Sequence, residues 1–99
     1  MKFNRSRTKK LAKIFAFFGM IPQLLKLKEE CEELADAIKE YRERMTSKNG
    51  EHLIEELADV LIMSEQIVLG LTKEQNQKLQ ETIDFKISRT IARIEAEDE

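Results

Sequence analysis

The sequence has only three glycines, one proline, one cysteine and one histidine, and it has no tryptophan. So few glycines and prolines supply too few tight turns for a β-sandwich or barrel, which argues against an all-β fold. Cys31 and His52, each the only residue of its type, exclude an internal disulfide, a zinc finger and any site with two imidazoles. No apolar run approaches the roughly 18 residues of a membrane helix, so we expect no membrane partner.

What remains is typical of one soluble globular domain over residues 1–99. Hydrophobic residues make up 41% of the chain and charged residues 36%, a composition too apolar for a disordered protein. On a helical wheel Cys31 falls on the apolar stripe of its helix, which favours a buried thiol in a reducing compartment, so we expect a cytoplasmic protein.

Charge is distributed unevenly along the chain. Eight basic residues precede the first acidic residue, Glu29: Lys2, Arg5, Arg7, Lys9, Lys10, Lys13, Lys26 and Lys28. Because the whole chain carries −2, residues 29–99 carry −10. The basic N-terminal segment, residues 1–18, has the charge to attract nucleic-acid phosphates or an anionic surface, although most such stretches are only solvated. A nucleic-acid partner is therefore an alternative and not the main expectation.

Helical periodicity predicts an all-α fold, a four-helix bundle with a short first helix and three longer ones. The first two expected helices span about residues 8–18 and 22–45, the third begins at residue 48 or 50 and ends near 70, and the fourth spans about 73–95. Gly19 ends the first helix, and Pro22 fits the first position of the second. Ser47 or Asn49 would cap the third helix. A capping box at residues 72–75, Thr-Lys-Glu-Gln, would start the fourth.

The expected second and third helices differ in how much apolar surface they carry. The second has one apolar stripe, made of Leu24, Leu27, Cys31, Leu34, Ala35, Ile38 and Tyr41. The third is apolar over more than half its circumference, at Leu53, Ile54, Leu57, Ala58, Val60, Leu61, Ile62, Ile67, Val68, Leu69 and Leu71. A surface helix buries a narrower stripe, and one small chain has few helices to cover both sides. We therefore expect a homo-oligomer with the third helix at or near its interface.

Four carboxylates lie within five residues of the second expected helix, at Glu29, Glu30, Glu32 and Glu33. Ion pairs within the helix can account for Glu30 and Glu32, because a lysine lies four residues before each. Glu33 has no basic residue at a helical offset. Something outside its own helix is therefore expected to compensate its charge.

A second acidic pair, Glu56 and Asp59, lies in the most apolar helix and meets no Lys or Arg at helical offsets. Carboxylates beside a packing surface are costly to keep ionised unless another charge neutralises them. If the second and third helices pack antiparallel, Glu30 and Glu33 would face this pair. Such an all-oxygen set suits Mg²⁺ or Mn²⁺ better than Zn²⁺. The alternative is a charged surface band that pairs with basic residues of other helices.

The fourth expected helix carries a basic stripe, Lys86, Arg89 and Arg93, beside an apolar face. Arg93 has a partner at Glu97, whereas Lys86 and Arg89 have no acidic residue at helical offsets. Arginine suits bidentate contact with phosphate. Acidic metal ligands and a basic stripe on one small domain are typical of a polyphosphate site.

The motif Glu29-Glu30-x-x-Glu33, followed by Glu56-x-x-Asp59, resembles the paired acidic motif of the MazG-like nucleotide pyrophosphohydrolases, within the all-α NTP pyrophosphatase superfamily. The resemblance covers about residues 19–94. It extends to the surroundings of the motifs, in Gly19-x-x-x-Gln23-x-x-Lys26 and the basic stripe. It implies that residues 19–96 form the catalytic helices.

The resemblance implies a Mg²⁺-dependent enzyme, with Mn²⁺ as a possible substitute, that hydrolyses (d)NTP to (d)NMP and pyrophosphate in nucleotide-pool house-cleaning. The implied metal ligands are Glu30, Glu33, Glu56 and Asp59. Glu29 or Glu33 would orient or deprotonate the attacking water. The implied substrate-binding residues are Gln23, Lys26, Lys86, Arg89 and Arg93, and Phe15 or Phe18 could stack on the base. Family members of this size often form homodimers or homotetramers. The alternatives are a non-enzymatic helical interaction module and a nucleic-acid-binding protein that uses its basic N-terminus.

Overall fold

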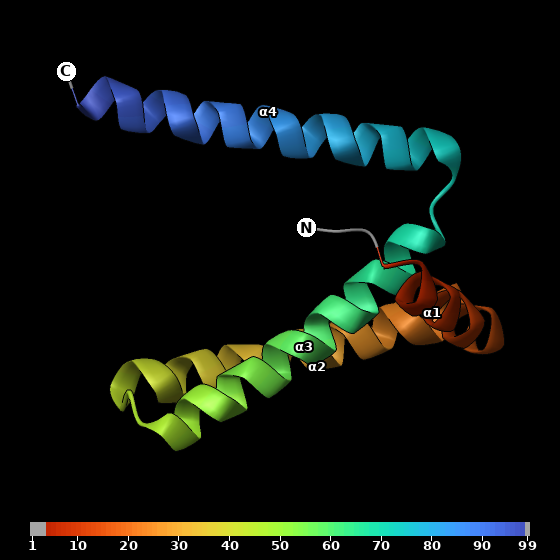
Figure 1. The fold of residues 1–99 in the computed structure, drawn as a ribbon, viewed down its shortest axis with the longest axis horizontal. Helices are drawn as coiled ribbons and strands as arrows, with labels where there is room; N and C mark the ends of the chain where they lie inside the picture. Colours follow the sequence, from red (N-terminus) through yellow and green to blue (C-terminus); the bar gives the residue numbers. More distant parts are fainter. Residues whose placement is uncertain (1–3, 99) are drawn as a thin grey trace.

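The computed structural model describes residues 4–98, which form four helices and no strand (Figure 1). The helices are α1 (Arg5–Phe18), α2 (Met20–Glu43), α3 (Ser47–Leu69) and α4 (Lys73–Glu97). The prediction of an all-α fold with four helices is confirmed. Lys2, part of the basic N-terminal segment, lies outside the described residues.

A single residue, Gly19, separates α1 from α2. Its φ of 87° lies in the left-handed region, which glycine adopts without the steric cost that a Cβ brings. As predicted, Gly19 ends α1. The second helix already begins at Met20, so Pro22 lies in its first turn rather than at its first position. The missing N–H of Pro22 costs little there, because the first four N–H groups of a helix have no partner within the helix.

Side chains cap the other helix starts. Thr46 caps α3, its hydroxyl accepting from the backbone N–H of Asn49 at 3.2 Å, so neither Ser47 nor Asn49 is the cap. The Asn49 amide instead donates to the carbonyl of Arg44 at 3.0 Å and closes the turn between α2 and α3. At α4 the capping box of Thr72 and Gln75 is present, as predicted.

The second and third helices form an antiparallel pair, and α1 lies across one end of it (Figure 1). The buried residues of α2 are Gln23, Glu30 and Ala37, seven residues apart and therefore on one stripe of the helix. They face an α3 surface whose buried residues are Met63 and Gln66. The interface thus includes three polar side chains among its most buried members.

The apolar stripe predicted for α2 is only partly buried. Leu27, Leu34 and Tyr41 are half-buried beside the Gln23–Glu30–Ala37 stripe, whereas Leu24, Cys31, Ala35 and Ile38 are exposed in the single chain. The helix is turned so that Glu30 and Gln23 face α3. The prediction that Cys31 is buried is therefore wrong for this chain alone.

The contact between α1 and the end of α3 depends on Gly70. A Cβ at Gly70 would clash with the ring of Phe15 and meet the terminal methyl carbon of Met20 at 2.8 Å. Phe15 is therefore packed against the backbone at Gly70 and is not free to stack on a nucleobase. Leu11, one turn earlier in α1, is 5% exposed and belongs to the same contact region.

The fourth helix stands apart from the other three (Figure 1). No residue of α4 is buried, and Ile87 and Ile94 are more than half exposed. Over residues 4–98, the buried hydrophobic residues are Leu11, Ala37 and Met63 alone. The chain therefore presents a large apolar surface, as the expected homo-oligomer requires. Within the described part of the chain, no helix is long and apolar enough to cross a membrane.

Candidate metal centre

Three carboxylates from two helices meet in the α2–α3 interface. Glu30 and Glu33, one turn apart on α2, and Glu56 on α3 each contribute one oxygen, and these three oxygens lie within 4.8 Å of one another. The antiparallel pairing of α2 with α3 brings them together, as the sequence predicts. We call Glu30, Glu33 and Glu56 the carboxylate cluster.

Two members of the carboxylate cluster have buried oxygens without a hydrogen-bond partner. Glu30 is 5% exposed, and the side chain of Glu56 is 14% exposed. The Oε2 atoms of both are buried, and neither has a partner. A buried polar atom without a partner typically costs about 1–3 kcal/mol, and more when it is charged. A cation or a hydrogen-bond donor placed between α2 and α3 would therefore stabilise these two oxygens.

The raised pKa of Glu33 also indicates that the carboxylate cluster lacks positive charge. The charge of Glu30 raises the pKa of Glu33, and partial desolvation and the charge of Glu56 raise it further. Three carboxylates this close disfavour full ionisation. A divalent cation among them would reverse the effect and favour the ionised form of all three.

The Lys26 ammonium occupies one side of Glu30. Its Nζ lies 3.1 Å from Glu30 Oε1 and 3.6 Å from Glu29 Oε2. The hydrogen bond with Glu30, and secondly the charge of Glu29, raise the pKa of Lys26. The ion pair that the sequence offered for Glu30 is therefore present, but it engages only one of the two oxygens.

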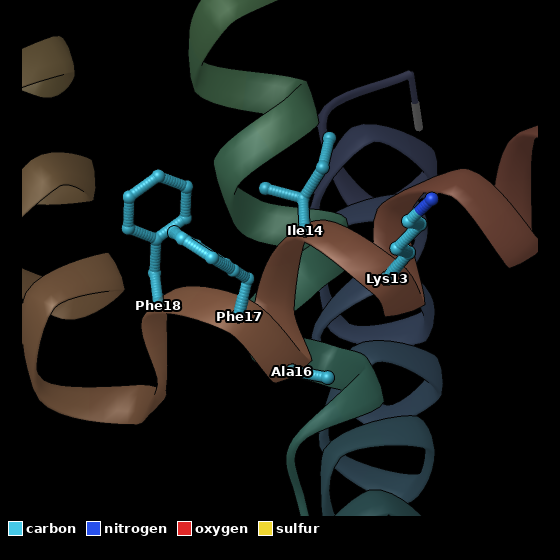
Figure 2. Close-up of a pocket in the computed structure, with 5 residues that line it drawn as sticks. All are labelled: Lys13, Ile14, Ala16, Phe17 and Phe18. Atoms are coloured by element: carbon cyan, nitrogen blue, oxygen red, sulfur yellow. The ribbon is translucent and has the colours of Figure 1, made fainter.

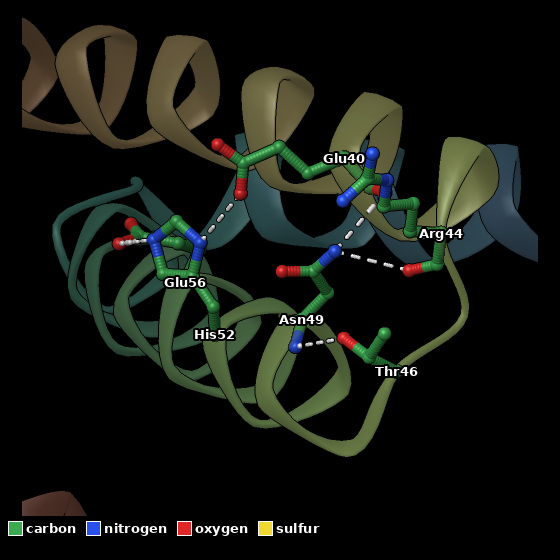
Figure 3. Close-up of polar contacts among 6 residues, drawn as sticks. All are labelled: Glu40, Arg44, Thr46, Asn49, His52 and Glu56. Atoms are coloured by element: carbon green, nitrogen blue, oxygen red, sulfur yellow. Dashed lines mark hydrogen bonds and ion pairs between the residues drawn. The ribbon is translucent and has the colours of Figure 1, made fainter.

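His52 has the corresponding position beside Glu56 and was not among the predicted site residues. Its Nε2 lies 3.3 Å from Glu56 Oε1, and its Nδ1 lies 3.0 Å from Glu40 Oε2, as Figure 3 shows. The hydrogen bond with Glu40 is the main cause that raises the pKa of His52, and Glu56 adds to it. The available signal was the four-residue spacing of His52 and Glu56, which a search for Lys and Arg alone passes over.

Asp59, the fourth predicted ligand, lies one turn beyond Glu56 on α3. It is exposed and is not part of the carboxylate cluster. Glu29, predicted to act on the water, is also exposed and contacts Lys26. The structure thus leaves both residues outside the carboxylate cluster, and their predicted roles stay predictions.

Gln23, predicted to contact substrate, is buried in the α2–α3 interface. Its Nε2 donates to Gln66 Oε1 at 2.7 Å, and Gln66 is 1% exposed. The Gln66 amide in turn lies 3.4 Å from the carbonyl of Ile62 and 3.6 Å from the sulfur of Met63. A nucleotide contact by Gln23 would require this pair to open. No local pattern points to Gln66, because its partner is 43 residues away along the chain.

The basic stripe of α4 is not brought to the carboxylate cluster within one chain. Lys86, Arg89 and Arg93 are exposed on a helix that stands apart from α2 and α3 (Figure 1). The Arg89 guanidinium lies 5.7 Å from the ring centroid of Phe85, on its own helix. The predicted role of these three residues in phosphate binding therefore stays a prediction.

Two shallow surface hollows lie elsewhere, and no carboxylate lines either of them. One is on α4, lined by Lys86, Ile87, Thr90 and Ile91. The other is on α1, where Lys13, Ile14 and Ala16 adjoin the exposed rings of Phe17 and Phe18 (Figure 2). Neither hollow is therefore part of the carboxylate cluster.

The carboxylate cluster fits a hard divalent cation. All of its donor atoms are carboxylate oxygens, the ligands that Mg²⁺ and Mn²⁺ prefer, and two of them are buried without a partner. A structural band of surface ion pairs would leave neither oxygen in that state. The arrangement can therefore hold a cation between α2 and α3.

Comparison with known proteins agrees with this geometry. The family model of the MazG nucleotide pyrophosphohydrolase domain matches residues 21–96, which hold the carboxylate cluster and the basic stripe. No curated protein and no solved structure matches the chain significantly.

Proposed function

The chain belongs to the MazG nucleotide pyrophosphohydrolase family, and from this premise we propose that it hydrolyses (d)NTP to (d)NMP and pyrophosphate. The observation that carries the proposal is the carboxylate cluster, in which two buried oxygens have no partner. The reaction would serve nucleotide-pool house-cleaning in the cytoplasm.

The proposed metal ligands are Glu30, Glu33 and Glu56, with Mg²⁺ as the ion and Mn²⁺ as a substitute. Asp59 joins them if its exposed side chain turns toward Glu56, one turn away on the same helix. When bound, the ion supplies positive charge to phosphate oxygens and increases the acidity of a water molecule. The chain itself supplies three negative charges at fixed positions.

Glu29 or Glu33 would orient the water that attacks the α-phosphorus. Both are exposed, so a solvent molecule can reach them. Glu29 contacts Lys26 and Glu33 belongs to the carboxylate cluster, so either carboxylate lies close enough to orient a water held there. The carboxylate accepts the water proton as the new P–O bond forms, and pyrophosphate leaves with the electrons of the broken bond.

The basic residues would hold the phosphates. Lys26 already lies at the cluster, whereas Lys86, Arg89 and Arg93 extend away from it. We therefore place the basic stripe of one chain at the carboxylate cluster of a second copy, in a homodimer or homotetramer. The exposed apolar residues of α3 and α4 support such an assembly, because association would remove them from water.

The test is hydrolysis of a panel of canonical and modified nucleoside triphosphates with Mg²⁺, followed by identification of the products. The proposal expects a nucleoside monophosphate and pyrophosphate in equal amounts. A diphosphate with inorganic phosphate, or no Mg²⁺-dependent turnover of any member of the panel, would contradict it. Omission of Mg²⁺ should abolish product formation, and Mn²⁺ should restore it.

A further inference from the structure

The two buried carboxylates of the cluster are held in the same way. Lys26 binds Oε1 of Glu30 at 3.1 Å, and His52 lies 3.3 Å from Oε1 of Glu56. In both cases the nitrogen belongs to the residue four positions earlier on the same helix. In both cases the other oxygen, Oε2, is buried and has no partner. The antiparallel helices α2 and α3 thus repeat one arrangement across the cluster.

This arrangement limits how each carboxylate can bind a cation. A carboxylate free to rotate can offer both oxygens to one ion, as Ca²⁺ sites often require. When one oxygen is held by a nitrogen, the plane of the group is fixed and one oxygen remains available. Mg²⁺ prefers to bind few carboxylates, each through one oxygen, and it retains several waters. The pattern at Glu30 and Glu56 therefore suits Mg²⁺ or Mn²⁺ better than Ca²⁺.

The His52 ring is itself fixed from the opposite helix. Nδ1 lies 3.0 Å from Oε2 of Glu40, which belongs to α2 (Figure 3). Glu40, His52 and Glu56 therefore form a continuous polar chain from α2 to a member of the cluster on α3. Outer partners of this kind orient the groups that bind a metal.

We propose that His52 is a positioning residue of the metal centre, which holds one oxygen of Glu56 and leaves the other as a single ligand atom. Glu40 fixes the His52 ring, and Lys26 acts in the same way on Glu30. The inference rests on the proposed function in one respect, that the cluster binds a divalent cation. It also gives Lys26 a role in orienting Glu30, in addition to the phosphate contact proposed above.

The experiment is a titration of the full-length protein with Mn²⁺ alone, with free Mn²⁺ measured by electron paramagnetic resonance. Competition with Mg²⁺ and with Ca²⁺ gives the selectivity. The variants are His52→Ala, His52→Gln, Glu40→Ala and the double variant of His52→Ala with Glu40→Ala. Glu51→Gln is the matched control, because it removes an exposed carboxylate next to His52. Circular dichroism and the thermal midpoint report the fold of each variant.

His52→Ala should weaken Mn²⁺ binding by roughly 10-fold or more, the usual effect of losing an outer partner, and should improve the relative binding of Ca²⁺. His52→Gln keeps an N–H donor at the same position and should recover part of the loss. Glu40→Ala should weaken binding less, and should add nothing in the His52→Ala background, because it acts through His52. Glu51→Gln should bind as the native chain does.

The outcomes separate this inference from the proposed function. If the native chain binds no Mn²⁺, the metal centre and the inference both fail. If the native chain binds Mn²⁺ and His52→Ala binds it equally well with unchanged selectivity, the inference fails and the metal centre stands. Should His52→Ala not fold, His52→Gln and Glu40→Ala decide: binding and selectivity like those of the control would overturn the role of His52.

Discussion

The helices α2, α3 and α4 are of nearly equal length, 24, 23 and 25 residues, but α2 and α3 pack together whereas α4 does not pack against either. The pair buries Gln23, Glu30 and Gln66 and gathers negative charge in its interface. By contrast, α4 buries no residue and carries the basic stripe in the open. One chain therefore places the proposed metal ligands in the α2–α3 interface and the proposed phosphate-binding residues on a separate helix.

The largest loss of activity is expected for a substitution in the α2–α3 interface. Glu56→Gln removes one charge of the carboxylate cluster at nearly constant size and should lower turnover by more than about 100-fold, the upper range for loss of an outer partner alone. Glu55→Gln, the exposed neighbouring residue, is the matched control and should retain activity. Steady-state pyrophosphate release measures both. Equal activity in the two variants would place the chemistry outside the cluster.

The next prediction concerns α4. Arg89→Ala, combined with Lys86→Ala, should inactivate the enzyme through loss of phosphate contacts while leaving Mn²⁺ binding intact. Mixing this variant with Glu56→Gln under conditions of subunit exchange should restore about a quarter of native activity for a dimer with sites shared between chains, by statistical pairing. Activity in the mixture no higher than the sum of the two variants would show that the basic stripe does not act in trans.

A smaller effect is expected for the stability of the metal-free protein as pH changes. The pKa values of Glu33 and His52 are both raised in the folded chain, so between the unfolded and folded pKa values the folded state binds more protons. Stability should therefore fall as the pH rises from the ordinary pKa of each group in the unfolded chain through its raised pKa in the folded chain. Mg²⁺ opposes this, and at 100 times its Kd it would add about 2.7 kcal/mol, a shift on the order of 10 °C.

Thermal unfolding at several pH values, with and without Mg²⁺, measures this effect. The stabilisation by Mg²⁺ should be greatest at the high end of the range, where protons no longer compete for the carboxylates. Glu33→Gln should flatten the dependence of the metal-free midpoint on pH. A midpoint that rises with pH, or a metal effect that is constant across this range of pH, would contradict the electrostatic account of the cluster.

The smallest effect is expected for the buried amide pair. Gln66→Leu leaves the Gln23 amide buried without its partner and should destabilise the chain by about 1–3 kcal/mol. Adding Gln23→Leu should recover most of that loss, because both polar groups are then gone. Urea unfolding of the single and double variants measures the coupling. If the double variant is simply the sum of the two single ones, the pair does not act as a unit.

Features that depend on neighbouring residues in the sequence were predictable. Gly19 ends α1, and Thr72 with Gln75 starts α4, because these signals act within one turn. Glu30, Glu33 and Glu56 were predictable as a group, since helical spacing and antiparallel pairing suffice to bring them together. The family resemblance rests on the same residues and is confirmed.

Features that depend on distant pairing were not predictable. Hydropathy assigns Gln23 and Gln66 to the surface, yet both are buried in the interface, where the Gln23 amide donates to Gln66. That pair and Glu30 turn α2, so that Cys31 faces outward instead of into the core. The bond from His52 to Glu40 joins two helices, and no offset within one helix reveals it. Helical spacing also does not give the direction of α4, which buries no residue against the other three helices.

A cation bound by the carboxylate cluster would be seen most directly in an anomalous difference map from crystals of the protein grown with Mn²⁺. We expect a single strong peak, or a close pair of peaks, between Glu30, Glu33 and Glu56, with the Oε2 atoms of Glu30 and Glu56 as ligands. Crystals that diffract well with Mn²⁺ present, yet show no peak there and carboxylates turned outward to water, would contradict it.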